Sequence, residues 1–334
     1  MRIQLKLNSQ NFKSGFSDFS SLTYKCILLI LCIAILIWIF PSLRNKNEVI
    51  NNYHVSKWNE YSKEVDRSYL NLKNQYSVGD SGVDSIANTG ENPSAKTSVN
   101  TSKISLNHVY GGVVSHHVPT MIPQLVRFYF DLKMHQNVKK FIVIGPDHVN
   151  AGSSYITTSS ASFITSYAEL KPINDLSTKM QDQGLATIEE LPFADEHSIG
   201  SQFLVISKIF PEAKVTPIIL RSNTPKEKAI ELGRFLARNL DEDTVVIASV
   251  DFSHYLPHAQ AKNIDEISGQ VLKTLDQKSV SLITADSNRS MNTFIEAMLS
   301  KGAKLTDKVQ VLNTNDVMQN SDYTTGYVFG YWGK

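Results

Sequence analysis

The stretch Lys139–Asn150, KKFIVIGPDHVN, decides the fold class that we expect for this chain. Its apolar and β-branched residues 141–144 predict a short buried strand, which a Gly-Pro pair then interrupts. Asp147 and His148 follow directly. Ligands of an open α/β sheet bind in the crevice outside the carboxyl ends of its strands. The stretch therefore predicts functional side chains at such an edge.

Two further stretches repeat this arrangement. The apolar run Gly111–His117, GGVVSHH, ends on paired histidines. The run Thr244–Tyr255, TVVIASVDFSHY, continues into Asp251 and His254. We therefore expect three strands to bring histidine and aspartate side chains to one edge of a sheet.

Strands and helices are expected to alternate from Leu106 onward, which is typical of an α/β domain. We predict a single domain over residues 106–334, with a mostly parallel sheet flanked by helices. The strands are expected at residues 110–115, 141–145, 154–158, 214–220, 244–250, 308–313 and 324–332. The helices are expected at 120–135, 174–183, 198–209, 225–239, 261–276 and 289–301.

Composition disfavours one class of partner and one kind of metal ligand. The 33 Lys and Arg residues nearly balance the 32 Asp and Glu residues, so no excess positive charge exists to attract nucleic acid. The cysteines Cys26 and Cys32 both lie in one apolar segment near the N-terminus. The rest of the chain therefore offers neither a disulfide nor a thiolate ligand.

The N-terminal region predicts a membrane anchor. After a polar segment over residues 1–24, the run Cys26–Phe40 is apolar and carries no charge. Residues 25–43 approach the roughly 20 residues that a transmembrane helix requires. A cleaved signal peptide and a buried core helix are the alternatives. Basic residues are slightly more numerous before this run than after it, which favours a single-pass anchor with the following domain on the non-cytoplasmic side.

Residues 44–105 are expected to connect this anchor to the domain. The segment Asn47–Leu72 has some helical periodicity and predicts a juxtamembrane helix. The segment Ser77–Ser105 is rich in Ser, Gly, Asn and Thr, and it contains too few large apolar residues to fold alone. It is therefore predicted to be a flexible linker.

Histidines at the ends of strands are the candidate metal ligands. His117 and His148 each follow a predicted strand. Two neutral imidazoles and one oxygen donor form a common open site for a divalent transition metal. The alternative is that each is a loop histidine hydrogen-bonded to the backbone.

Two further segments supply candidate acid and base groups. His197 follows Asp195 and Glu196 at the start of a predicted helix, where either carboxylate would cap the helix and His197 would act as an acid or base. Asp251 and His254 would share a turn, and a purely structural turn is the alternative. Neither a Gly-rich phosphate loop nor a Gly-x-Ser-x-Gly elbow occurs.

The predicted domain resembles the Memo family, also called AmmeMemoRadiSam system protein B, whose fold is that of the extradiol ring-cleaving dioxygenase catalytic subunits. GGVVSHHVPT resembles the family's Pro-His-Ala-Gly segment and places His117 on its histidine. FIVIGPDHVNAG resembles Leu-Gly-Pro-Ser-His and carries His148. DEHSI is similar to Glu-His-Ser-Ile-Glu and carries His197, and VIASVDFSHY is similar to Ser-Ser-Asp-Phe-Ser-His-Tyr. FITSYAEL resembles the Thr-Pro-Leu-Gly segment, and SDYTTGYVFGYW resembles the closing Gly-Tyr strand.

The chain departs from this pattern at two informative positions. The resemblance implies that the third metal ligand is the Cys of a Cys-Gly-Arg segment, but the corresponding run here is SNRS, so that Ser287 replaces the cysteine. Asp286, directly before it, would restore an arrangement of two histidines and one carboxylate. Gly200 stands where the family has the glutamate after His-Ser-Ile.

Three functions follow as hypotheses. The first is a membrane-anchored Memo-like protein that binds iron or copper through His117, His148 and Asp286, with His197, Asp251 and His254 as acid, base or supporting groups. The second is an iron-dependent dioxygenase or oxidoreductase with an aromatic or quinone substrate. The third is a metal-free domain that binds an unidentified small molecule or protein. In each, residues 25–43 would contact membrane lipid.

Overall fold

The stretch quoted first forms a central strand of the sheet, β3 (Lys140–Pro146). Its residues 141–146 are buried, as the apolar run predicts. β3 pairs in parallel with β8 (Lys214–Leu220) on one side and with β9 (Thr244–Ser249) on the other. The computed structural model describes residues 53–79, 104–305, 309–318 and 324–334, all within a unit over Asn52–Lys334.

The strands form one mixed sheet with a mostly parallel centre. Its order is β1-β5-β6-β8-β3-β9-β2-β12-β10, while β4 pairs with β8 and β7, and β11 pairs with β12. The four neighbours β8, β3, β9 and β2 are parallel, whereas β12, β10 and β11 add antiparallel strands at one end. The remaining strands are β1 (Tyr53–Val55), β2 (Val109–Val114), β4 (Ile156–Thr158), β5 (Ser162–Ile164), β6 (Glu169–Pro172), β7 (Thr187–Ile188), β10 (Lys304–Leu305), β11 (Gln310–Asn313) and β12 (Gly326–Gly333).

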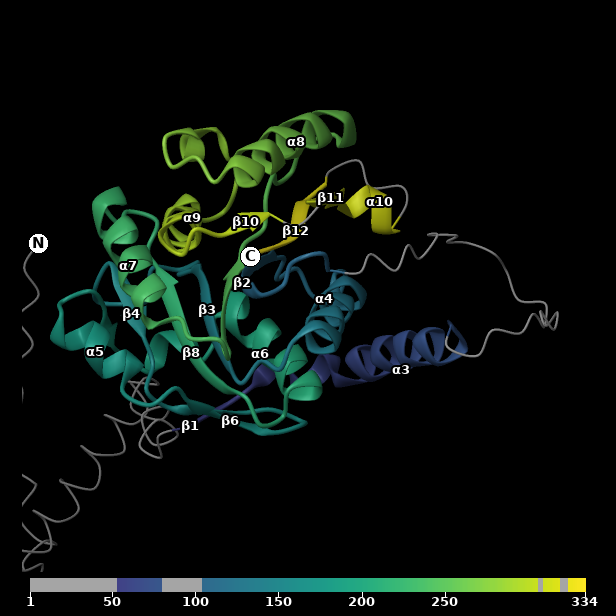
Figure 1. Cartoon of the computed structure of the whole chain (residues 1–334), viewed down its shortest axis with the longest axis horizontal. Coiled ribbons are helices and arrows are strands. Elements are labelled where there is room, and N and C mark those ends of the chain that lie inside the picture. The colour runs from purple at the N-terminus through teal and green to yellow at the C-terminus, as the bar shows by residue number, and fades with distance from the viewer. Residues whose placement is uncertain (1–52, 80–103, 306–308, 319–323) are drawn as a thin grey trace, which may run out of the picture. The chain divides into compact units, whose positions relative to one another are not determined.

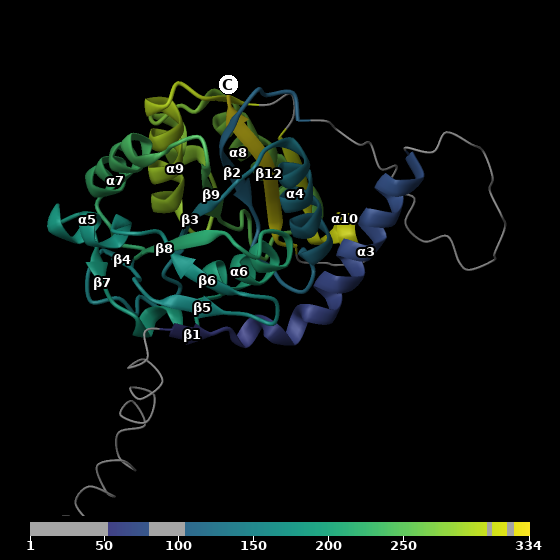
Figure 2. The same ribbon diagram turned by 60° about the horizontal axis from the view of Figure 1, so that its bottom comes forward.

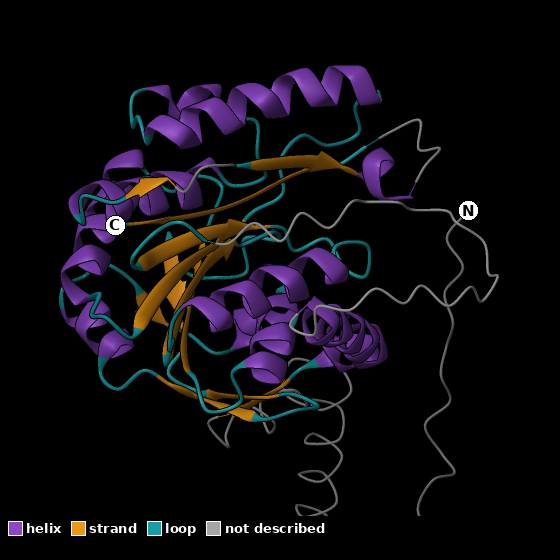
Figure 3. Ribbon diagram, turned by 45° about the vertical axis from the view of Figure 1, so that its right-hand side comes forward, coloured by secondary structure: helices purple, strands orange, loops and turns teal. Residues whose placement is uncertain are grey.

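Helices cover both faces of the sheet (Figure 1, Figure 3). α3, α4 and α6 contribute to one buried apolar cluster, and α7, α8 and α9 contribute to a second. In α7, for example, Leu232, Phe235 and Leu236 form the buried face that their helical spacing predicts. The helices are α3 (Ser62–Gly79), α4 (Ile122–His135), α5 (Leu176–Asp182), α6 (His197–Ile209), α7 (Lys226–Asn239), α8 (His258–Thr274), α9 (Asn288–Ser300) and α10 (Thr314–Met318), with the 3-10 helices η1 (Lys57–Tyr61), η2 (Leu191–Phe193) and η3 (Ser279–Leu282).

Residues 53–79 belong to the folded unit, although we expected residues 44–105 to be a juxtamembrane segment and linker. β1 pairs in parallel with β5, and α3 lies beside α4 (Figure 2). The Tyr76 hydroxyl donates a hydrogen bond to Asp131 of α4, and Val65 is fully buried. The helix predicted within Asn47–Leu72 overlaps α3. The apolar residues of α3, such as Val65 and Leu72, pack into the core of the domain, whereas we expected this segment to lie between the membrane and the domain.

The α/β class and the mostly parallel sheet are confirmed. Each helix predicted after Leu106 is present with similar bounds, and so are the predicted strands. Short strands such as β5, β6 and β7 were not predicted, because two to four residues carry too little periodicity to identify. The predicted membrane span, residues 25–43, lies outside the described residues. No helix in the described part of the chain is long and apolar enough to cross a membrane.

Candidate metal centre

Four parallel strands end at one edge of the sheet and position the candidate site. Val114 of β2 lies opposite Ser249 of β9, and Pro146 of β3 lies opposite Leu220 of β8. β3 and β9 are themselves neighbours. Side chains that follow these strands are therefore close in space although they are far apart in sequence.

His116 follows β2 and is the most buried histidine of the site, with 2% of its side chain exposed. Its backbone N–H donates to Asp251 Oδ1 at 3.2 Å. Its ring Nδ1 lies 3.3 Å from the Ser249 hydroxyl, and its Nε2 lies 3.0 Å from Asp286 Oδ2. Both ring nitrogens therefore have fixed partners, which orient the imidazole.

His148 follows β3 and is held by Glu196, the N-cap residue of α6. The Glu196 Oε1 atom lies 2.7 Å from His148 Nδ1, and Glu196 Oε2 accepts the backbone N–H of His148 at 3.0 Å. Glu196 Oε1 also accepts the Ser198 backbone N–H. The prediction that a carboxylate caps this helix is confirmed. Since Nδ1 is occupied, His148 presents Nε2, which lies 3.8 Å from Asp286 Oδ2.

His197 begins α6 and stacks on His148, with 3.9 Å between the ring centroids. The start of α6 reaches the end of β3 because Gly145 has no side chain: a Cβ there would lie 2.4 Å from Ser198 Oγ. Ser198 Oγ also donates to the Pro146 carbonyl. This close approach brings His197 to the histidine that follows β3.

Trp58 of η1 covers part of the site from the N-terminal segment. Its ring lies 6.0 Å from that of His197. The indole occupies space above Gly200, where an added Cβ would lie 1.9 Å from its Cδ1 and Nε1 atoms. Lys57 contacts Asp195 at 2.5 Å beside it. The absence of a side chain at Gly200 therefore provides room for Trp58.

Asp251 and Asp286 supply the carboxylates on the other side of His116. The Asp286 N–H donates to the Asp251 carbonyl, and the Asp251 N–H donates to Asp286 Oδ2. Asp251 Oδ1 also accepts the Ser115 hydroxyl at 2.5 Å. The Asp286 Oδ1 atom is buried without a hydrogen-bond partner among the described residues. Ser287 instead caps α9 by accepting the Ser290 N–H.

Two of the predicted site residues lie outside this group. His117 follows His116, but its Nδ1 atom lies 2.6 Å from the Tyr327 hydroxyl. His254 lies beside Tyr255, with 5.9 Å between the ring centroids. The structure thus brings together His148, His197, Asp251 and Asp286 from the predicted set, and it adds His116 in the place where we expected His117.

Charge compensation sets the protonation of the three clustered histidines. Burial lowers the pKa of His148, but contacts with Asp286 and Glu196 outweigh it and raise the pKa to about 9. Burial also lowers the pKa of His116, yet Asp251 and Asp286 raise it overall. By contrast, burial and the positive charges of His116 and His148 lower the pKa of His197 to about 4.

The carboxylates respond in the opposite direction. Burial raises the pKa of Glu196, but the hydrogen bond from His148 outweighs it and lowers the pKa to about 2. Burial likewise opposes ionisation of Asp286, while His116 and His148 hold the pKa of its carboxyl well below the usual range. Without a bound cation, these carboxylates therefore favour the protonated forms of His148 and His116.

These residues fit a metal ion. His116, His148 and His197 each offer a ring nitrogen, and the three ligand atoms lie within 4.8 Å of one another. Asp286 adds an unpaired carboxylate oxygen. The Glu196–His148 bond matches the carboxylate–histidine pairs that orient metal ligands. A bound ion would displace the proton on His148, whose pKa is raised to about 9, so metal binding would release protons.

Sequence reasoning missed two members of the site. Adjacent residues on an extended chain point in opposite directions, so the pair HH at residues 116–117 shows that one histidine faces the edge but not which one. Trp58 lies in a segment that we expected to be separate from the domain. Its only signal was its place in the apolar periodicity of residues 55–72.

Comparison with known proteins identifies the class of protein to which this fold and site belong. The family model described as Memo-like protein matches residues 107–330. Because that range covers more than half of the chain, the chain belongs to the Memo-like protein family.

Several relatives carry the same family name at low identity. MEMO1 family protein MK0963 of Methanopyrus kandleri is 26% identical, over 56% of this chain and 69% of its own. A MEMO1 family protein of Desulfurococcus amylolyticus is 24% identical, over 66% and 77%. MEMO1 family protein MmarC6_1286 of Methanococcus maripaludis is 25% identical, over 65% and 81%. Among solved structures, the uncharacterized protein JW3007 from Escherichia coli K12 is 12% identical, covers 66% of this chain and 99% of that one, and has a TM-score of 0.42.

Proposed function

We propose that this Memo-like protein binds one divalent transition-metal ion through His116, His148 and His197, with Asp286 as the carboxylate ligand. The observation that carries the proposal is the convergence of three imidazoles on one edge of the sheet, each with its ligand atom within 4.8 Å of the others. His116 takes the role that the sequence led us to assign to His117.

The donor chemistry suits iron(II), copper(II) or zinc(II). Imidazole suits iron, copper and zinc, whereas copper(I) prefers sulfur ligands. Nitrogen and oxygen atoms form the whole of this donor set, since the residue in the place of the family's cysteine is Ser287, which caps α9. When bound, such an ion supplies Lewis-acid or redox chemistry. The protein orients His148 through Glu196 and covers His197 with Trp58.

Metal analysis of the full-length chain tests this proposal. After removal of metal with a chelator, the chain is loaded under anaerobic conditions with iron(II), copper(II) or zinc(II) in separate samples and freed of excess ion. About one retained ion per chain is expected. His148→Ala should lose it, and His254→Ala serves as the matched control because His254 lies outside the cluster. Equal retention in both variants would contradict the proposal.

A second candidate function is an iron-dependent oxidoreductase. Two histidines and one carboxylate are typical of non-haem iron oxygenases, and the cluster contains these groups together with a third histidine. Oxygen uptake by the iron-loaded chain with catechol as the probe tests the proposal. Uptake equal to that of the metal-free chain would contradict it.

We also propose that residues 25–43 anchor the domain in a membrane, with the domain on the non-cytoplasmic side. The support is the uncharged apolar run Cys26–Phe40 and the balance of basic residues around it. Full-length protein should stay with membranes after a carbonate wash. Its release into the soluble fraction would contradict the anchor.

A further inference from the structure

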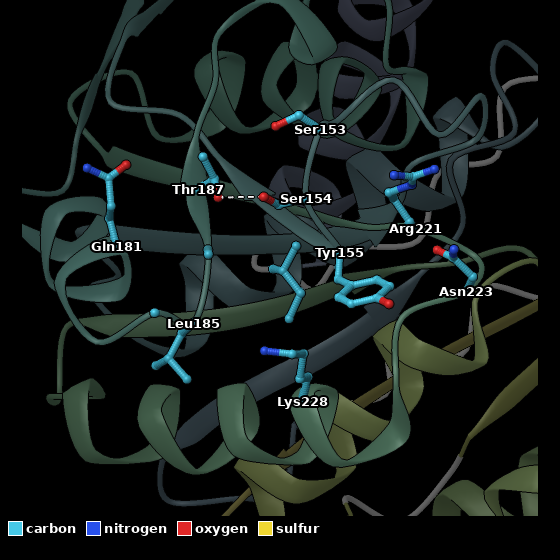
Figure 4. Close-up of a pocket in the computed structure, with 12 residues that line it drawn as sticks. Ser153, Ser154, Tyr155, Gln181, Leu185, Thr187, Arg221, Asn223 and Lys228 are labelled. Atoms are coloured by element: carbon cyan, nitrogen blue, oxygen red, sulfur yellow. Dashed lines mark hydrogen bonds between the residues drawn. The ribbon is translucent and has the colours of Figure 1, made fainter.

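A cavity of about 540 Å³ lies apart from the histidine cluster, and none of the cluster residues lines it. Its walls come from the entry to β4, the end of α5 and start of β7, the turn after β8, and the first turn of α7 (Figure 4). Its volume is within the range of small-molecule sites. The lining residues are Ser153, Ser154, Tyr155, Ile156, Gln181, Gly184, Leu185, Ala186, Thr187, Arg221, Asn223 and Lys228.

Two cations in this cavity have no counter-ion. Neither Arg221 nor Lys228 forms an ion pair with another described residue. The Nε atom of Arg221 is buried and has no hydrogen-bond partner among the described residues. Elsewhere in the domain, Arg127, Arg234 and Lys208 each contact a carboxylate. Arg221 lines the cavity, so an anion bound there would compensate its positive charge, although it would not reach the buried Nε atom itself.

The other lining groups suit the rest of such a ligand. The Gln181 side-chain oxygen accepts the Ile188 backbone N–H, which leaves the amide N–H groups to donate. Tyr155 is 43% exposed and offers an aromatic ring. In Figure 4, Lys228 rises from α7 into the cavity, and Tyr155 lies between Lys228 and Arg221 in this view. Polar donors and apolar surface therefore share one cavity.

Negative charge is confined to the margin. Among the described residues that line the cavity, none is acidic. The backbone N–H and the hydroxyl of Ser153 both donate to the Glu189 carboxylate. In Figure 4, Ser153 lies at the end of the cavity away from Lys228. Glu227 is exposed on the first turn of α7. The lining itself therefore carries two uncompensated positive charges.

We propose that this cavity binds a phosphorylated small molecule, with the positive charges of Arg221 and Lys228 attracting the phosphate. A phosphate monoester carries a charge of about −1.5 to −2 at pH 7, which matches the two cations better than a single carboxylate does. The planar guanidinium also binds phosphate through two N–H groups. The ester group would pack on Tyr155 and Leu185. This proposal does not depend on a metal at the histidine cluster.

Titration of the full-length, chelator-treated chain with phenyl phosphate tests the assignment by calorimetry. We expect saturable binding that weakens with added salt, with inorganic phosphate and benzoate binding at least tenfold more weakly. Arg221→Gln and Lys228→Gln should each weaken phenyl phosphate binding at least tenfold. Arg238→Gln, at the far end of α7 and exposed, removes one charge as a matched control and should have no effect.

Three results would overturn the proposal. They are an absence of saturable binding, equal affinities in Arg221→Gln and the unmodified chain, and benzoate affinity equal to that of phenyl phosphate. If phenyl phosphate bound only to metal-loaded chain, the anion would be a ligand of the ion and the cavity assignment would fail. Metal content measured in separate metal-loaded samples of Arg221→Gln and Lys228→Gln distinguishes this outcome from failure of the metal site.

Discussion

Neighbouring strands of one sheet carry two sites of opposite electrostatic character. At the ends of β2, β3 and β9, His116 and His148 each have a carboxylate partner, and Trp58 covers their neighbour His197. At the end of β8, Arg221 has no carboxylate partner among the described residues. The comparison teaches that one sheet edge can suit a cation where carboxylates collect and an anion where they do not.

The largest expected effect comes from removing the carboxylate of the first site. Asp286→Asn keeps the shape of the side chain but removes the charge beside His116 Nε2. Loss of a ligand should reduce metal affinity by more than the 10–100-fold typical of a supporting group. Metal titration followed by elemental analysis measures this loss.

Ser287→Ala is the matched control for that variant. Ser287 caps α9, so its removal should lower the free energy of unfolding by about 1 kcal/mol without changing metal affinity. A large loss of metal in Ser287→Ala, with retention in Asp286→Asn, would assign the ligand to the family's cysteine position instead.

The covering of the first site is tested at Gly200. Glycine to alanine within a helix normally stabilises by about 0.5–1 kcal/mol. Here the new Cβ would meet the Trp58 indole at 1.9 Å, so Gly200→Ala should destabilise the domain by about 1–3 kcal/mol. Denaturant unfolding monitored by circular dichroism measures the change.

The same substitution in a Trp58→Ala background isolates the contact. Without the indole, Gly200→Ala should be neutral or stabilising, because only the helix preference remains. Destabilisation of equal size in both backgrounds would show that Trp58 does not occupy the space above Gly200.

The carboxylate partners of the first site also predict a pH dependence for the metal-free chain. The folded-state pKa of His148 is about 9, above its ordinary value of 6.5, so its pairing stabilises fully below pH 6.5 and is lost as the pH rises toward 9. The free energy of unfolding of chelator-treated chain should therefore fall over this range. In His148→Gln, most of this decrease in the free energy of unfolding should be absent, and only the contribution of His116 should remain. An unchanged slope in the variant would contradict the pairing of His148 with Asp286 and Glu196.

The smallest effect is expected in the second site. Arg221→Met removes an unpaired buried donor while keeping an apolar stem, so it should raise the free energy of unfolding by about 0.5–1 kcal/mol. Thermal unfolding without added anion measures this gain. Destabilisation would indicate that Arg221 has a structural role, and the contrast between the two sites would lose its basis.

The sequence predicted the fold far better than it predicted the pairing of side chains. The long apolar strands β3, β8 and β9 carry a strong periodic signal, so their positions followed directly. Which histidine of the pair 116–117 faces inward depends on where β2 ends, and one residue reverses the direction of the side chain. The lesson is that a strand-end motif locates an edge but not the ligand.

Some contacts between segments distant in sequence could not be predicted. Glu196 was recognised as a helix cap, but its bond to His148 joins residues from two elements. Trp58 lies before residues 107–330, the range that matches the family, and its contact with His197 depends on the absence of a side chain at Gly200. That Arg221 after β8 and Lys228 of α7 line one cavity likewise becomes evident only from the arrangement of these elements in space.

The most direct test of the metal site compares two adjacent residues. Full-length chains with His116→Ala and His117→Ala are loaded with iron(II), freed of excess ion and measured for metal content per chain. The account predicts about one ion in the unmodified chain and in His117→Ala, and loss of the ion in His116→Ala. Retention in His116→Ala with loss in His117→Ala would contradict it.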